Sequence, residues 1–217
     1  YRFRHDRCIV EKRSGVGVMD KFGLEIIPYI YDNIAPNSYW SPAYYRATYN
    51  NQEGVLALNG TEIIPCIYDD IDTWLTTDNF MVKSGKLKGL YTPRGKVIVP
   101  CEYTKISRWR ETSLIHVKID DQEGLYSPEG QEILPCQFII CKELNGISLI
   151  NRGGFSKNGK VQNGIWGAIN KEGKIIVPCK YNDITPYAGS ERIEADGGYI
   201  KDIYDFNGNY LRSEYKW

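Results

Sequence analysis

Short apolar runs alternate with polar turns along the whole chain, and the runs recur at a nearly fixed interval. Five copies share a glycine, a second glycine six positions later, a proline five positions after that, and an aromatic residue three positions further on. The prolines are Pro28, Pro65, Pro100, Pro135 and Pro178, and the separations between them are 37, 35, 35 and 43 residues. A period in this range is typical of solenoids, propellers and other repeat arrays.

Each copy predicts a buried strand after its second glycine. These segments are rich in Ile and Val, and they are apolar on both faces near their start, as in a strand covered on both sides. They span Leu24–Tyr31, Thr61–Tyr68, Lys96–Tyr103, Gln131–Phe138 and Lys174–Tyr181. The proline inside each segment lacks an amide donor, so we expect it at a bulge, a sheet edge or the end of the strand.

Two further strands precede the buried one in each copy. The Asn-Gly, Arg-Gly and Glu-Gly pairs before the buried strand indicate tight turns. The resulting prediction is a three-stranded antiparallel meander, and a short segment such as Tyr68–Ile71 is a candidate for a fourth strand.

The fold class predicted is all-β, with about six tandem antiparallel meanders of roughly 35 residues in one repeat domain, 1–217. The last unit, 191–217, is degenerate, since Asp202 replaces its first glycine and Ser213 its proline. Polar terminal repeats act as caps. This pattern favours an open curved array, or solenoid, over a closed six-bladed propeller-like ring.

Charge and hydropathy exclude some partners. The chain has 27 basic and 27 acidic side chains, so it lacks the basic excess of nucleic-acid-binding proteins. No apolar run approaches the roughly 20 residues needed to cross a bilayer. We therefore expect neither a nucleic-acid partner nor membrane insertion.

Four cysteines occupy one repeat position, directly after the proline. They are Cys66, Cys101, Cys136 and Cys179, and Tyr29 fills this position in the first copy. The alternation of side chains places them on the face shared by the preceding aliphatic residue and the following aromatic one. We expect buried, reduced thiols, which favours a cytoplasmic location, with a cell-surface or secreted protein as the alternative.

The fifth copy reads W-G-A-I-N-K-E-G-K-I-I-V-P-C-K-Y-N-D-I and resembles the WG repeat family of bacterial proteins. The naming pair is Trp166-Gly167, whereas the other copies keep the glycine and place Val16, Glu53, Lys88 or Glu123 before it. The resemblance implies a bacterial binding or scaffolding module, and the family pattern supplies no catalytic residue.

Metal and catalytic motifs are weak. His5 and Cys8 have chelate spacing, but no second pair follows as zinc sites require. The acidic cluster Asp69-Asp70-Asp72 has turn-forming equivalents in other copies, so the turn interpretation outweighs calcium binding. The chain also lacks a phosphate loop and a nucleophile elbow. We expect no cofactor, no metal and no enzyme activity.

Two irregular segments are candidate binding sites. The aromatic loop around Trp40, Tyr44 and Tyr45 is typical either of sugar or protein recognition or of buried loop anchors. The long spacing before Pro178 places extra residues at 151–164, a segment with basic residues and no acid. Its candidate contact residues are Arg152, Phe155, Lys157 and Lys160. Insertions in repeat proteins project as loops, so this one favours an acidic partner or is simply a tolerated hairpin.

The function predicted is a non-catalytic scaffold that mediates protein–protein interaction. A glycan-binding module that uses the aromatic loop is the alternative. A glycosidase-like hydrolase is the third hypothesis, and it requires paired carboxylates converging in one cleft.

Overall fold

The computed structural model describes residues 6–37, 43–73, 79–110 and 112–216. Apart from one short 3₁₀ turn, the regular structure of these residues consists of strands in antiparallel sheets, and none of these sheets closes into a barrel. The described strands therefore agree with the predicted all-β open array of meanders.

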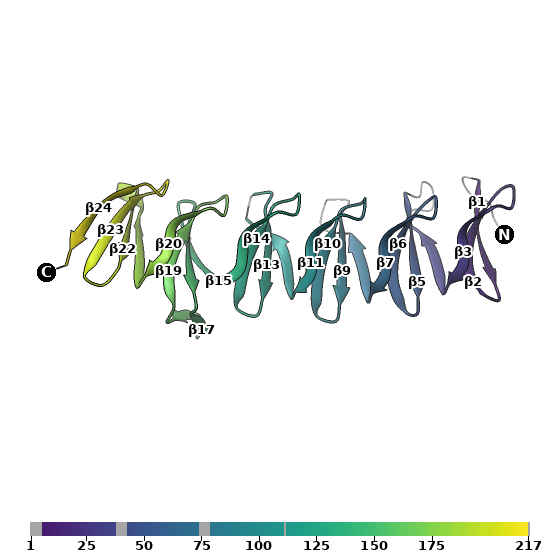
Figure 1. The fold of residues 1–217 in the computed structure, drawn as a ribbon, viewed down its shortest axis with the longest axis horizontal. Helices are drawn as coiled ribbons and strands as arrows, with labels where there is room; N and C mark the ends of the chain where they lie inside the picture. Colours follow the sequence, from purple (N-terminus) through teal and green to yellow (C-terminus); the bar gives the residue numbers. More distant parts are fainter. Residues whose placement is uncertain (1–5, 38–42, 74–78, 111, 217) are drawn as a thin grey trace. The chain divides into compact units, whose positions relative to one another are not determined.

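The chain divides into two compact units, Tyr1–Cys101 and Glu102–Trp217. The single repeat domain expected for 1–217 stays a prediction, and each unit is described by itself below. Within each unit, successive sheets lie side by side along the chain (Figure 1).

The first unit contains three sheets. A three-stranded sheet is followed by two four-stranded sheets, and the last strand of the third sheet ends just past the unit boundary. The strands are β1 (Arg7–Lys12), β2 (Gly15–Asp20), β3 (Glu25–Tyr31); β4 (Asn33–Pro36), β5 (Tyr44–Tyr49), β6 (Gln52–Ala57), β7 (Glu62–Tyr68); β8 (Asp70–Thr73), β9 (Phe80–Ser84), β10 (Leu87–Tyr91) and β11 (Val97–Tyr103).

The second unit contains a seven-stranded sheet, a two-stranded hairpin and a final four-stranded sheet. The strands are β12 (Lys105–Arg108), β13 (Ile115–Ile119), β14 (Gln122–Tyr126), β15 (Glu132–Leu144), β16 (Ile147–Arg152), β19 (Ile165–Ile169), β20 (Ile175–Tyr181); β17 (Phe155–Lys157), β18 (Lys160–Gln162); β21 (Asp183–Tyr187), β22 (Arg192–Asp196), β23 (Ile200–Asp205) and β24 (Tyr210–Tyr215).

The short fourth segment of each copy belongs to the next sheet, which corrects the predicted three-stranded unit. Segments such as β4 and β8 pair with the first long strand of the following copy, so the second, third and last sheets have four strands each. In the fourth copy this segment runs straight on from the buried strand as β15, and two copies share one sheet of seven strands. The chain thus crosses from one copy to the next within a few residues.

The prolines of four copies lie in β-bulges, one of the three places expected for them. Val16 pairs with Tyr31, whereas Val18 pairs with Ile27, so extra residues around Pro28 bulge out of the ladder. The same register shift recurs beside Pro65, Pro135 and Pro178. The bulge brings the strand backbone against the first glycine of the copy. A Cβ on Gly54 would lie 2.8 Å from the Ile64 carbonyl oxygen, so a side chain does not fit there.

Two repeated contacts join neighbouring copies. The turn glycine packs on the strand of the preceding copy: Gly60 has φ +88°, and a Cβ there would lie 2.5 Å from the Ile26 carbonyl oxygen. Tyrosine hydroxyls also pair between copies, at 2.7 Å for Tyr68–Tyr91. The same pairing recurs at 2.9 Å for Tyr103–Tyr126 and 2.6 Å for Tyr181–Tyr204. The periodic aromatic residues are therefore structural.

The first and last copies differ from the rest. The Tyr29 ring is buried with Cys8 and Val10 on the face that other copies pack against a predecessor, and the Lys12 ammonium lies 3.3 Å from its centroid. Every residue of β24 is exposed, and its Arg212 pairs with Glu214 at 2.8 Å. The first copy thus has a buried aromatic ring where the others have half-buried cysteines, and the last copy has exposed residues in the strand that is apolar and largely buried in the others.

The six cysteines are free thiols, of which only Cys8 is fully buried. The four that follow the prolines are half-buried, which corrects the expectation of complete burial. Burial still raises the pKa of Cys66 and of Cys179 to about 11. These thiols are therefore protonated and poorly nucleophilic near neutral pH.

Candidate functional site: the inserted hairpin and its groove

The extra residues of the fifth copy form the hairpin β17–β18, which projects from the sheet (Figure 1). Its pairs are Phe155↔Gln162, Ser156↔Val161 and Lys157↔Lys160. Asn158 and Gly159 have φ values of +51° and +72°, as an Asn-Gly type I′ turn requires. The sequence located this insertion correctly, and its turn chemistry makes it an ordered hairpin.

Asn151 fixes the base of the hairpin. Its side chain is fully buried; its Oδ1 accepts a hydrogen bond from the Gly154 amide at 3.0 Å, and its Nδ2 donates to the Asn163 carbonyl at 3.0 Å. A Cβ on Gly154 or Gly164 would collide with Oδ1. Sequence reasoning treated Asn151 only as the start of the insertion. The signal available in the sequence was the presence of a glycine near each end of the insertion, Gly154 and Gly164.

A groove of about 510 Å³ lies between this hairpin and the sheet. Ser156, Gly159, Lys160 and Val161 of the hairpin line one side, and polar residues of the β13–β14 hairpin line another. The apolar lining residues are Ile139, Ile140, Cys141, Leu149 and Trp166. The groove therefore joins the insertion to the tryptophan of the Trp-Gly pair, which the sequence did not connect.

In three other copies the position of Trp166 belongs to a polar pair. Arg46 pairs with Glu53 at 2.7 Å, and Lys201 pairs with Glu194 at 2.7 Å with the signs exchanged between the strands. In the fourth copy the pair is His116–Glu123 at 2.6 Å. In the fifth copy the two positions hold Leu149 and Trp166, so this part of the groove is apolar.

The His116 ring also accepts or donates a hydrogen bond at 3.3 Å to Ser107, which completes a Ser-His-Glu series. Each member lies on a repeat position, and the His–Glu pair matches the Arg46–Glu53 and Lys201–Glu194 pairs. The series therefore belongs to the framework of the repeat. It also borders the groove, because Glu123 lines it.

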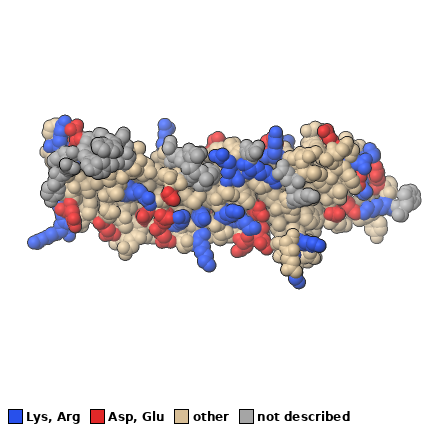
Figure 2. All heavy atoms as spheres, turned by 180° about the vertical axis from the view of Figure 1, so that it is seen from behind, with Lys and Arg blue, Asp and Glu red and all other residues tan. Residues whose placement is uncertain are grey.

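The hairpin has a basic surface. Arg152, Lys157 and Lys160 are exposed, and the Phe155 side chain is 48% exposed. Figure 2 shows basic side chains on the projecting hairpin at the lower right. Of the residues predicted for the insertion, Phe155, Lys157 and Lys160 thus lie on the hairpin, and Arg152 is the last residue of β16 at its base.

The aromatic loop is arranged differently. Tyr45 is only 4% exposed and packs in a core cluster with Ile27 and Leu56. The Tyr44 ring packs edge-on against Phe80, with centroids 4.9 Å apart. Trp40 lies outside the described residues. Tyr44 and Tyr45 are therefore packed, as in the alternative that the sequence left open for them.

The described residues contain no group of three His, Cys, Asp or Glu side chains that could hold a metal. His5 lies outside the described residues. In the acidic cluster, Asp69 accepts from the Gly85 amide at 2.6 Å, Asp70 pairs with Lys83, and Asp72 accepts from the Thr73 amide. These carboxylates are used in hydrogen bonds of the fold. The described part of the chain also has no helix that could cross a membrane.

Comparison with known proteins identifies the repeat. The sequence model of the WG-containing repeat family matches residues 58–83, 89–122 and 166–191. This chain is a WG-repeat protein. The third matched region begins at Trp166, whereas the first two begin after Glu53 and Lys88, the residues at the equivalent position.

Solved structures add little to the family match. The AfRom2 CNH domain is 13% identical over 97% of this chain and 81% of its own, with a TM-score of 0.28. BamB from Moraxella catarrhalis is 12% identical over 97% and 73%, with a TM-score of 0.26, and Hsv2p from Kluyveromyces lactis is 10% identical over 79% and 60%, with a TM-score of 0.28. TM-scores this low give no basis for inferring function. No curated protein matches the chain.

Proposed function

We propose that this WG-repeat protein is a non-catalytic scaffold that binds an acidic segment of another protein at the hairpin β17–β18 and its groove. The observation that carries the proposal is the placement of Lys157 and Lys160 on the projecting hairpin, with Arg152 at the end of β16 beside its base, next to a groove that has apolar lining residues. A partner with acidic side chains would match the charge of the hairpin, and its apolar side chains would fill the groove.

The hairpin suits this role because hydrogen bonds fix its base and its tip is exposed to solvent. Asn151 and the Asn158-Gly159 turn define its backbone, so little conformational freedom is lost on binding. Phe155 offers an exposed aromatic ring of the kind that anchors protein interfaces. The free thiols favour a reducing compartment, so we extend the proposal to a cytoplasmic partner.

We do not propose glycan binding, because Tyr44 and Tyr45 are packed in the fold rather than displayed. A hydrolase would need two or three carboxylates converging on one cleft. Asp121 and Glu123 line the groove, but Glu123 is engaged by His116 at 2.6 Å and by Lys118 at 3.8 Å.

The test uses labelled twelve-residue peptides in which Glu alternates with Leu or Phe, and matched peptides with Lys in place of Glu. We expect fluorescence anisotropy to show saturable binding of the acidic peptides alone, weakening as salt is added. Replacing Arg152, Phe155 and Lys157 with alanine together should weaken binding by about tenfold or more at an unchanged melting temperature.

The matched control replaces Phe22, Lys86 and Arg94, which are one aromatic and two basic residues exposed in the first unit. This variant should bind the acidic peptides as the parent protein does. Equal binding by the hairpin variant, or no preference for acidic peptides, would refute the proposal.

A further inference from the structure

Five asparagines of the chain are followed by glycine, and each of these pairs lies in a connection between two strands. The pairs are Asn59-Gly60, Asn145-Gly146, Asn158-Gly159, Asn163-Gly164 and Asn207-Gly208. In such a pair the glycine nitrogen can attack the side-chain carbonyl of the asparagine, because glycine has no Cβ to hinder the approach. The reaction needs a free glycine amide and a turn that can open, so the contacts of each turn decide which pair reacts.

Two of the five pairs lie in the turns that join neighbouring copies. The Gly60 amide donates a hydrogen bond to the Ala57 carbonyl at 2.9 Å, and the Gly208 amide donates to the Asp205 carbonyl at 3.1 Å. Gly208 also packs on the preceding copy, as Gly60 does, because a Cβ there would lie 2.7 Å from the Ile176 carbonyl oxygen. In both turns the nitrogen that would attack is bound and covered.

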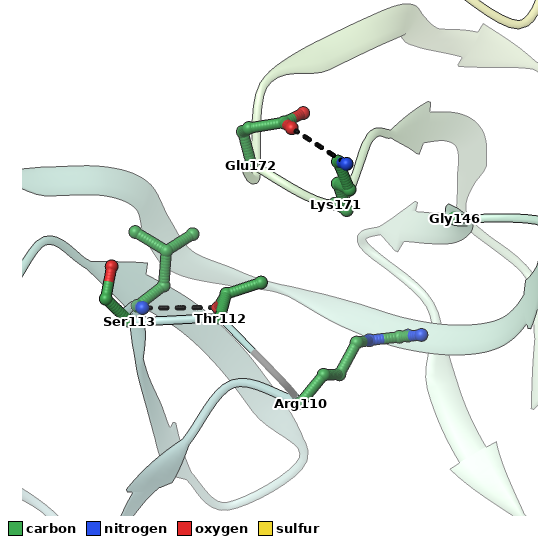
Figure 3. A pocket seen from close by; sticks show the side chains of 7 residues that line it. Arg110, Thr112, Ser113, Gly146, Lys171 and Glu172 are labelled. Carbon is green, nitrogen blue, oxygen red and sulfur yellow. Dashed lines mark hydrogen bonds and ion pairs between the residues drawn. The ribbon is translucent and has the colours of Figure 1, made fainter.

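Two further pairs are held by the surrounding sheet. The Asn163 carbonyl accepts the Nδ2 hydrogen bond of the buried Asn151, and a Cβ on Gly164 would collide with the Oδ1 atom of Asn151. Asn145-Gly146 forms the β15–β16 turn of the seven-stranded sheet and is followed by the buried Ile147. This turn also lies in the wall of a cavity of about 790 Å³, which side chains of two other connections line (Figure 3). Opening either connection therefore disturbs the sheet.

Asn158-Gly159 is the pair with the fewest such contacts. Both residues are exposed, and among the described residues none outside the adjacent chain places an atom within 4 Å of the position of a Cβ on Gly159. In the same part of the structure, no turn or side-chain hydrogen bond uses the Gly159 amide. The flanking strands β17 and β18 have three residues each and pair only with one another, and a two-stranded hairpin is marginally stable by itself. Opening this tip therefore breaks less structure than opening any of the other four turns.

Two ammonium groups flank the turn. Lys157 and Lys160 are directly opposite one another in the pair that closes it, and both are exposed. The attacking nitrogen becomes anionic when it loses its proton, and nearby positive charges favour the charged form of such a group. The hairpin thus combines the turn that opens at the lowest cost with a local charge that favours the reaction.

We propose that Asn158 is a modification site, where the side-chain amide is replaced by a carboxylate without any catalyst. The Gly159 nitrogen gives its proton to solvent and forms a bond to Cγ of Asn158, while the Cγ–Nδ2 bond breaks and ammonia leaves with a proton from water. A water molecule then adds to one of the two carbonyl groups of the resulting cyclic imide and opens the ring. The product is aspartate or isoaspartate, in which the main chain runs through the former side chain.

The product changes both the charge and the geometry of the hairpin tip. A carboxylate replaces a neutral amide between Lys157 and Lys160, so the basic surface loses part of its positive charge. Isoaspartate also adds a backbone atom to a turn whose two-residue length fixes the strand pairing. An acidic partner should therefore bind the modified protein more weakly, a consequence that rests on the proposed function.

The experiment incubates the folded protein in mildly alkaline buffer and follows every Asn-Gly pair by peptide mapping with mass spectrometry. The readouts are the mass change from amide to acid and the separation of aspartate from isoaspartate. We expect Asn158 to react at least about tenfold faster than Asn59, Asn163 and Asn207, with Asn145 between them. Protein unfolded in urea is the control for sequence effects, and there the five pairs should react at similar rates.

A rate at Asn158 no higher than those at Asn59 and Asn207 in the folded protein would overturn the proposal. An equally large advantage of Asn158 in the unfolded protein would also overturn it, because the difference would then come from the neighbouring sequence and not from the fold.

The consequence for binding is tested separately with Asn158→Asp, which carries the charge of one product. We expect this variant to bind the acidic peptides about threefold more weakly than the parent protein. Asn59→Asp is the matched control, because it makes the same change at an exposed turn of the first unit, and its affinity should equal that of the parent. Equal affinity in Asn158→Asp would overturn the consequence. No binding by the parent would refute the proposed function instead, and the reaction rates would still decide the modification site.

Discussion

Two junctions between copies have different residues at the same repeat position, Glu53 in the first unit and Trp166 in the second. In the first unit, the Glu53 carboxylate accepts the Ile71 amide at 2.9 Å, and Arg46 donates both to Glu53 and to the Ile71 carbonyl. In the second unit, Trp166 at the position of Glu53 packs on the core cluster that contains Tyr181 and Ile184. Ile71 and Ile184 are equivalent residues of the strand that opens the next sheet.

The ion pair and the tryptophan therefore have the same structural role: each joins one copy to the first strand of the next. They differ in what they leave beside them. The cavity next to Arg46 is only about 160 Å³, whereas the one next to Trp166 is about 510 Å³ and is overhung by the hairpin. In the fifth copy the framework position therefore gives the groove an apolar lining residue, beside Glu123 of the fourth copy, which keeps its polar pair.

Transplanting the polar pair should have the largest effect. Trp166→Glu replaces ring packing with a carboxylate that faces Leu149, so we expect a loss of about 3 kcal/mol in the free energy of unfolding. Adding Leu149→Arg should restore about 1 kcal/mol by re-creating the pair of the second copy. Urea unfolding followed by circular dichroism measures both. A loss below about 0.5 kcal/mol for the single variant would show that the ring does not join the copies.

Removing the clamp of the hairpin should have the next largest effect. Asn151→Ala leaves the Gly154 amide and the Asn163 carbonyl without their partner, at a cost of about 2 kcal/mol to the local structure. Hydrogen exchange of the hairpin amides should accelerate while exchange in the first unit stays constant. Asn151→Asp keeps the acceptor but loses the donor, so it should give an intermediate rate. Unchanged exchange rates in Asn151→Ala would show that the Asn151 hydrogen bonds do not stabilise the hairpin.

Breaking the contacts of Glu53 with Arg46 and Ile71 should lower the free energy of unfolding by less, because these side chains are partly exposed. Glu53→Ala removes the acceptor of the Ile71 amide and the partner of Arg46, and we expect a loss of about 1 kcal/mol. Glu53→Gln retains the acceptor and should cost about half as much. Chemical unfolding of both variants separates the hydrogen bond from the charge. Equal losses for the two variants would assign the whole effect to the charge.

The smallest expected difference depends on pH. Hydrogen bonds from Ser213 and Tyr181 lower the pKa of Asp202, whereas the equivalent position of the third copy is Gly89. A lowered pKa means that the stability from Asp202 is fully present above about pH 4 and is lost as pH falls through the lowered value. Between about pH 5 and pH 3, the parent should therefore lose more stability than Asp202→Asn, by less than about 1 kcal/mol. If the free energy of unfolding changed with pH equally in the two proteins, Asp202 would not contribute to the pH dependence.

Much of the fold followed from the sequence because the pattern was repeated five times. The turn glycines, the bulge prolines and the doubly buried strands each have a local physical cause, so the positions of Gly60 and Pro65 were enough to predict their structure. The membership of the short fourth segment did not follow, since strand pairing depends on which neighbour the chain meets after the bulge. The insertion at 151–164 was located by spacing alone, but its clamp by Asn151 required the folded contacts.

The sequence by itself determined the repeat, its strands and the place where the repeat is interrupted, because backbone conformation and strand burial follow from local residue types. Only the tertiary structure showed that Trp166 and the hairpin line one groove and that Tyr45 is buried. These features join residues from different strands and turns, and their chemistry arises from proximity in space that no local pattern encodes.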